Sequence, residues 1–82
     1  MILVDVVFPE LGKTIDFQLD ENVLAWDVME EIAGIAAQNS ARHYLPKKHR
    51  VLLYCMETDR QIDLNHTLRE NGVRAGNRLL LI

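Results

Sequence analysis

The sequence predicts an α+β fold, in which one mixed sheet of four to five strands is covered by one long helix, with an additional short helical turn. Three observations predict this fold. Segment 14–20 alternates apolar and polar side chains, as a strand does, and the apolar segment 2–8 can place four of its side chains on one face. Residues 25–36 repeat apolar side chains at spacings of three and four, as an amphipathic helix does. Two further apolar segments, 50–56 and 78–82, follow the helix.

The first two strands are expected to form a hairpin. In ILVDVVF (2–8), four apolar side chains can share one face, with Asp5 and Val7 on the other. Pro9 cannot donate to a strand ladder, and a glycine follows it closely, so PELGK is expected to turn the chain. TIDFQLD (14–20) then alternates almost cleanly, which favours a half-buried second strand.

The helix is expected to begin near Asn22 and to continue to about Gln38. Asn22 is a favourable N-cap, and Asp27 lies early enough to favour the positive end of the helix dipole. Gly34 weakens the helix by up to about 1 kcal/mol relative to alanine. The segment NSARHYLP (39–46) is expected to be the exit from the helix.

The second half of the chain predicts short elements joined by turns. RVLLYCM (50–56) is expected to be a strand that pairs with a shorter one near 61–64. Thr67 and Glu70 have the spacing of a capping box, and a glycine two residues after Glu70 limits this segment to one or two helical turns. RLLLI (78–82) is expected to be the last strand.

The order of elements constrains the topology of the sheet. The first and last strands are both strongly apolar, and too much chain separates them for a tight hairpin. Parallel pairing at the centre of the sheet, with the helix crossing one face, satisfies both facts. The sequence therefore predicts a β-grasp sheet in a single domain, residues 1–82.

These residues resemble a known family. PKKHRVLL, TLRENGV and LGKTIDFQL are similar to segments of ubiquitin, and the resemblance extends over essentially the whole chain. DFQLDENV and TLRENGVRAGNRLLLI resemble more closely the bacterial ubiquitin-like proteins of the YukD and EsaB family. This resemblance implies a ubiquitin-like fold and an accessory role in the type VII secretion systems of Gram-positive bacteria. The segment before Pro46 and the segment YCMETDRQ are longer than in ubiquitin, so no partner surface carries over across them.

Composition and charge exclude several classes of function. The net charge is −3, and only PKKHR (46–50) is locally basic, whereas nucleic-acid binding normally needs a basic stripe. No apolar segment approaches the roughly 20 residues of a membrane span, and the N-terminus does not resemble a signal peptide. Cys55 is the only cysteine, so no internal disulfide is possible. We expect a cytoplasmic protein with no direct membrane insertion and no nucleic-acid partner.

No residue pattern predicts catalysis. Cys55 lacks metal-ligand spacing to His43, His49 or His66, and no carboxylate completes an obvious triad. Cys55 has the parity of Leu53, so we interpret it as a small buried residue. Glycine-rich phosphate loops are absent from the sequence. We expect no enzyme activity, no metal and no cofactor.

The sequence ends at Ile82 without the Gly-Gly tail that activating enzymes require. We therefore expect a protein that is not conjugated to others. A modifier or sulfur carrier remains an alternative if the chain is truncated or processed.

The residues expected to carry function lie on the sheet face opposite the helix. If Leu79 and Leu81 face the helix, then Leu80 and Ile82 face away from it, and by the same parity Leu52 and Tyr54 do so on the neighbouring strand, next to Arg50. Apolar side chains on a sheet can also simply shield its backbone. A cluster of this kind instead favours a protein-binding patch, made up of Leu52, Leu80, Ile82, Tyr54 and Arg50.

Trp26 is a possible second anchor. It lies in the first helical turn, beside the apolar stripe rather than within it. There it either closes the edge of the core or forms part of an interface, in which tryptophan is enriched.

The sequence thus predicts a ubiquitin-like protein–protein interaction module that belongs to a type VII secretion system and acts through the sheet face. Two alternatives remain open beside it: a homodimer or complex-embedded structural subunit, and the modifier described above.

Overall fold

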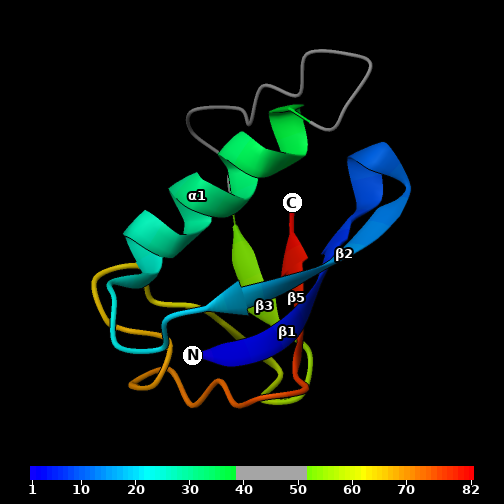
Figure 1. Cartoon of the computed structure of the whole chain (residues 1–82). Helices are drawn as coiled ribbons and strands as arrows, with labels where there is room; N and C mark the ends of the chain where they lie inside the picture. The colour runs from blue at the N-terminus through cyan, green and yellow to red at the C-terminus, as the bar shows by residue number, and fades with distance from the viewer. Residues whose placement is uncertain (39–51) are drawn as a thin grey trace.

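The computed structural model describes residues 1–38 and 52–82, which form one sheet with a helix across it (Figure 1). In chain order the elements are β1 (Ile2–Phe8), the 3-10 turn η1 (Pro9–Leu11), β2 (Lys13–Leu19), α1 (Ala25–Gln38), β3 (Leu53–Cys55), β4 (Arg60–Gln61) and β5 (Arg78–Leu81). The predicted hairpin, helix and last strand are therefore confirmed. The predicted helix exit, 39–46, and the first two residues of the predicted third strand lie outside the described residues. In the described ranges, no helix is long and apolar enough to cross a membrane.

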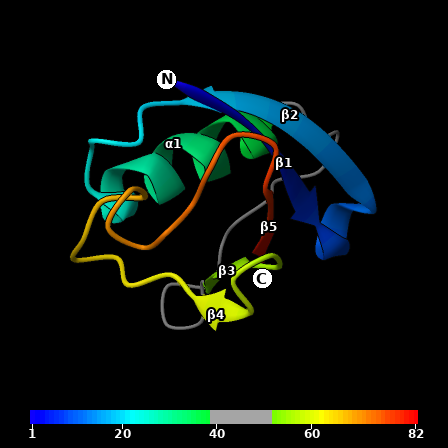
Figure 2. The same ribbon diagram turned by 90° about the horizontal axis from the view of Figure 1, so that it is seen from below.

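The strands lie in the order β2-β1-β5-β3-β4, so the first and last strands occupy the centre of the sheet. β1 and β5 are parallel, and every other pair is antiparallel. Figure 2 shows β2 and β4 at opposite edges. This is the predicted β-grasp arrangement, with α1 across one face of a mixed sheet.

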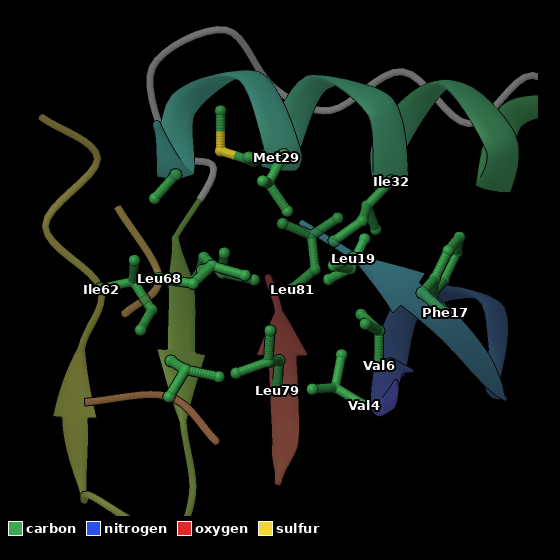
Figure 3. Close-up of a cluster of buried hydrophobic side chains, with 14 of the residues drawn as sticks. Val4, Val6, Phe17, Leu19, Met29, Ile32, Ile62, Leu68, Leu79 and Leu81 are labelled. Carbon is green, nitrogen blue, oxygen red and sulfur yellow. The ribbon is translucent and has the colours of Figure 1, made fainter. Parts of the chain in front are cut away.

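The core lies between the sheet and α1. Alternate residues of β1, from Val4 to Phe8, are buried, as are Leu79 and Leu81 of β5. Figure 3 shows the helical Met29 and Ile32 above the buried side chains of the sheet. Alternation at period 2 in the strands and at period 3.6 in the helix thus places both apolar faces in one core.

Helix α1 begins at Ala25, and the prediction that Asn22 caps it is wrong. Asn22 lies in the preceding turn, where its N–H donates to the carboxylate two residues before it (2.9 Å). The first N–H groups of the helix donate to a distant loop: Ala25 to the carbonyl of His66 (2.8 Å) and Trp26 to that of Leu64 (3.1 Å). Because such donors have no partner within a helix, the loop after β4 serves as the cap.

The turn after this loop contains the predicted capping box. The Glu70 N–H donates to the Thr67 hydroxyl (3.0 Å), and the Thr67 N–H donates to the Glu70 carboxylate (2.9 Å). One turn forms, closed by the Asn71 N–H on the Thr67 carbonyl (3.1 Å), and Gly72 follows it at φ 78°. Leu68, inside this turn, is fully buried. The capping box thus holds a core residue in place.

Replacing Thr67 with alanine is expected to lower the free energy of unfolding by about 1 kcal/mol, because the Glu70 N–H loses its acceptor. Urea unfolding of the two proteins measures the difference.

The N–H of Thr67 holds the pKa of Glu70 below its ordinary value. The stability from Glu70 is therefore present at neutral pH and is lost as pH falls through the lowered pKa. A Glu70→Gln variant should accordingly approach the wild type in stability under acid conditions. A constant difference across this range would contradict the assignment.

Candidate functional site: the open face of the sheet

The side of the sheet opposite α1, called here the open face, carries the predicted patch. On β5, Leu79 and Leu81 are buried beneath the helix, whereas Leu80 between them is half-buried on the other side. Ile82 continues this alternation and is 49% exposed. Consecutive aliphatic residues thus divide between the core and the open face.

The register places β3 beside these residues as predicted. Tyr54 lies directly opposite Leu80. Leu52 and Ile82 exchange two backbone hydrogen bonds of 2.9 Å each, which makes them a second directly opposed pair. Leu52 is 43% exposed and Tyr54 is half-buried. The pairing therefore brings four predicted patch residues together, while the fifth, Arg50, lies outside the described residues.

The structure adds Val7 to this surface. Val7 of β1 lies opposite Leu80, so Val7, Leu80 and Tyr54 form one row across three neighbouring strands. The alternation of β1 had placed Val7 on this face, but only the parallel register with β5 identifies its neighbour. From here on, the open-face patch means Val7, Leu52, Tyr54, Leu80 and Ile82.

The hydroxyl group of Tyr54 has a fixed partner at the edge of the patch. It donates a hydrogen bond to the carboxylate of Asp59 in the turn between β3 and β4. This bond, together with desolvation and the charge of Asp59, raises the pKa of Tyr54, because ionisation would place two negative charges side by side. The phenol therefore stays neutral over the physiological pH range.

A charged row borders the patch on its other side. Asp16 of β2 lies opposite Asp5 of β1, and Asp5 lies opposite Arg78 of β5. A hydrogen bond between the two carboxyl groups, and then their like charge, raise the pKa of Asp16. On β1 and β5, the patch therefore ends at charged side chains, Asp5 and Arg78.

Replacing Asp16 with asparagine is expected to stabilise the protein at neutral pH, because the repulsion from Asp5 disappears. The sign follows from the raised pKa. A carboxyl group whose pKa is higher in the folded state contributes its stability when protonated, and that contribution is lost as pH rises through the folded pKa. Chemical unfolding as a function of pH should show the advantage of the variant at pH 7 and its disappearance at acid pH. An advantage that grows in acid would refute the coupling.

Trp26 lies at a second surface. Its side chain is 48% exposed, and Val23 and Leu24, just before it, are 36% and 47% exposed. A residue that closes the edge of a core is normally covered to a greater extent, so the exposure favours the interpretation of Trp26 as an anchor. Neither neighbour was singled out by the sequence, because the expected helix started too early.

Cys55 is fully buried, as interpreted from its parity. Its sulfur lies 3.8 Å from the side-chain oxygen of Asn77 and 4.0 Å from the carboxylate of Glu57. The His66 ring instead pairs with Asp63 and Glu70, each at 3.6 Å. Within residues 1–38 and 52–82, no three potential ligands come close enough together to hold a metal ion. His43 and His49 lie outside these ranges.

Two hollows lie away from the patch. One, of about 400 Å³, is lined by residues that include Glu21, Arg69 and Arg74, and the other, of about 460 Å³, by residues 61–65. The residues that line these two hollows include none of the patch residues.

No protein-family model and no curated protein sequence matches this chain. Solved structures do match it. The ubiquitin-like domain of an Arabidopsis thaliana protein is 20% identical, with a TM-score of 0.70 over 99% of this chain and 74% of that chain. ATBAG1 in complex with HSP70 is 16% identical, with a TM-score of 0.70 over 100% of this chain and 40% of that chain. A chain of the toluene 4-monooxygenase HD complex with the inhibitor 4-bromobenzoate is 15% identical, with a TM-score of 0.75 over 98% and 94%. These likenesses show the ubiquitin-like β-grasp fold.

Proposed function

We propose that this chain is a protein–protein interaction module that docks through the open-face patch, without enzymatic chemistry of its own. One observation carries the proposal: the strand register gathers five large apolar or aromatic side chains on neighbouring strands, on the face opposite the helix. Scattered exposed apolar residues need no explanation, whereas a contiguous group bordered by charges is typical of a binding surface.

The proposed setting is the cytoplasmic side of a type VII secretion system, with the module as an accessory or regulatory component. Support comes from the sequence, because DFQLDENV and TLRENGVRAGNRLLLI resemble the YukD and EsaB proteins. These segments include the end of β2 and the whole of β5. The second segment therefore contains two residues of the patch itself, Leu80 and Ile82.

One of the similar structures belongs to a protein that was solved with a partner, since ATBAG1 was solved in complex with HSP70. The present chain spans 40% of the ATBAG1 chain. In this proposal, the present domain is likewise one element of a larger assembly.

A structural subunit is the second candidate, and one comparison favours it. The matched chain of the toluene 4-monooxygenase HD complex is covered over 94% of its length, so nearly an entire chain of that complex has this fold. In this alternative the same patch is permanently buried, either against a larger complex or against a second copy. Light scattering at micromolar concentration distinguishes the self-paired form, because a strict monomer excludes it.

Affinity capture from the native host tests the proposal. The wild type is expected to retain components of the type VII system, identified by mass spectrometry, and the double variant Leu52→Asp/Ile82→Asp is expected to lose them. The circular dichroism spectrum of the variant should stay native, because both side chains are exposed. Equal capture by both proteins would refute docking through the patch. If the wild type captures only proteins that are not part of the type VII system, and the double variant loses them, the secretion role is refuted and docking through the patch still holds.

A further inference from the structure

The outer face of α1 is a second distinctive surface. The helix buries Ala25, Val28, Met29, Ile32, Ala33 and Ala36 against the sheet. The opposite side carries Trp26, Asp27, Glu30 and Glu31, all of them exposed. Figure 3 shows Ile32 directed toward the sheet, which leaves the outer face on the far side of the helix from the open-face patch.

This face is acidic, and helix α1 itself contributes no lysine or arginine. From residue 14 to residue 41 the sequence contains no lysine or arginine. Asp27 and Glu31 are four residues apart, a spacing at which like charges destabilise a helix. Among the described residues, none of Asp27, Glu30 and Glu31 has a cationic partner. Within residues 1–38 and 52–82, no ion pair therefore offsets this repulsion.

Apolar side chains flank these charges at the helix start. Val23, Leu24 and Trp26 are all exposed within four consecutive residues. Tryptophan is the residue most enriched among the anchors of protein interfaces, and its ring also attracts lysine and arginine side chains through their positive charge. Exposed apolar side chains therefore lie directly beside carboxylates that have no cationic partner in the part of the chain that the structure describes.

Gly34 lies on the outer face of α1, toward the C-terminal end of the helix, and contributes no side chain to it. It lies eight residues after Trp26, about 12 Å along the axis, on the row that also contains Glu30. Its backbone is helical, and an added Cβ would meet nothing within 4 Å, so neither turn geometry nor packing requires glycine there. Glycine weakens a helix, and in return it lets another backbone approach closely.

We propose that the outer face of α1 is a second docking surface, which takes a basic amphipathic segment of a partner protein. The apolar side of that segment packs on Trp26 and the exposed residues before it, and its lysine or arginine side chains pair with Asp27, Glu30 and Glu31. Charge selects this occupant, because a carboxylate face repels the phosphates of nucleic acids and anionic lipids. The surface lies on the far side of the helix from the open-face patch, so both can be occupied together.

Two synthetic peptides test the proposal. One has leucine and lysine in an amphipathic helical pattern, and the other has glutamate in place of every lysine. The lysine peptide is expected to bind about tenfold or more tightly than its counterpart, and more weakly as salt is added. Trp26 is the only tryptophan, so its fluorescence emission should shift to shorter wavelength as the peptide covers it. No shift at saturation would overturn the proposal.

Variants locate the binding on this face. Glu30→Lys/Glu31→Lys is expected to reverse the peptide preference, and Trp26→Ser to weaken binding of a labelled lysine peptide about tenfold. The matched control Glu10→Lys/Asp16→Lys changes the net charge by the same amount away from the helix and should keep the wild-type preference. Loss of preference in the control, or its persistence in the helix variant, would refute the assignment. Leu52→Asp/Ile82→Asp should bind the lysine peptide like the wild type, which separates this proposal from docking at the open face.

Discussion

Replacing Leu81 with alanine is expected to lower the free energy of unfolding by about 2–5 kcal/mol, whereas the same change at the adjacent Leu80 should cost about 1 kcal/mol or less. Leu81 is 1% exposed and packs beneath the helix (Figure 3), so its truncation leaves a cavity in the core. Leu80 is half-buried on the open face, where water fills the space. The two neighbouring leucines thus form a matched pair.

The difference in stability between the Leu81 and Leu80 variants is measurable because the domain is small. At the usual stability per residue, 82 residues correspond to about 4–12 kcal/mol, so the Leu81 variant loses a large share of the total. Urea unfolding gives both differences, and an unchanged slope would show that the denatured states are comparable. Equal losses at the two positions would contradict the orientation of β5 on which the open-face patch depends.

The double variant Leu52→Asp/Ile82→Asp is expected to weaken partner binding at least about 30-fold, the effect of losing anchors worth 2 kcal/mol or more. The two residues form a directly opposed backbone pair, so both new carboxylates would lie side by side in the interface. Burying unpaired charge there costs several kcal/mol. Titration calorimetry with the captured partner measures the change.

Leu3→Asp is the control for this prediction. Leu3 is 56% exposed, more than Leu52, and it lies on the same sheet face beyond the row of Asp5 and Arg78. Binding should change little in this variant, because the charged row separates Leu3 from the patch. A loss as large as that of the double variant would show that the binding surface extends past the row of Asp5 and Arg78.

Period-2 alternation explains why so much of the fold was predictable. It assigned Leu79 and Leu81 to the core and Leu80 to the open face, and the strongly apolar end strands predicted their parallel pairing. The start of α1 was mispredicted because its cap is not local. The carbonyls that accept from Ala25 and Trp26 belong to a loop about forty residues later, which no sequence window contains.

Period-2 alternation also made most of the candidate site predictable, but the prediction missed one of its residues. Parity placed Leu52, Tyr54, Leu80 and Ile82 on one face, but contact between strands depends on register, and β1 contributes Val7 only through its pairing with β5. The acidic outer face of α1 was likewise only partly predictable. Its charges are visible in the sequence, whereas the exposure of Trp26 requires the fold.

Methyl NMR spectroscopy of the labelled protein with its captured partner tests the central claim most directly. Saturating partner is expected to shift or broaden the methyl signals of Val7, Leu52, Leu80 and Ile82, and to leave those of the buried Leu79 and Leu81 much less affected. That pattern would locate the contact on the open face of the sheet. Unchanged signals from all four patch residues, with changes confined to the edge strands or to the turn at 67–72, would contradict docking through the open face.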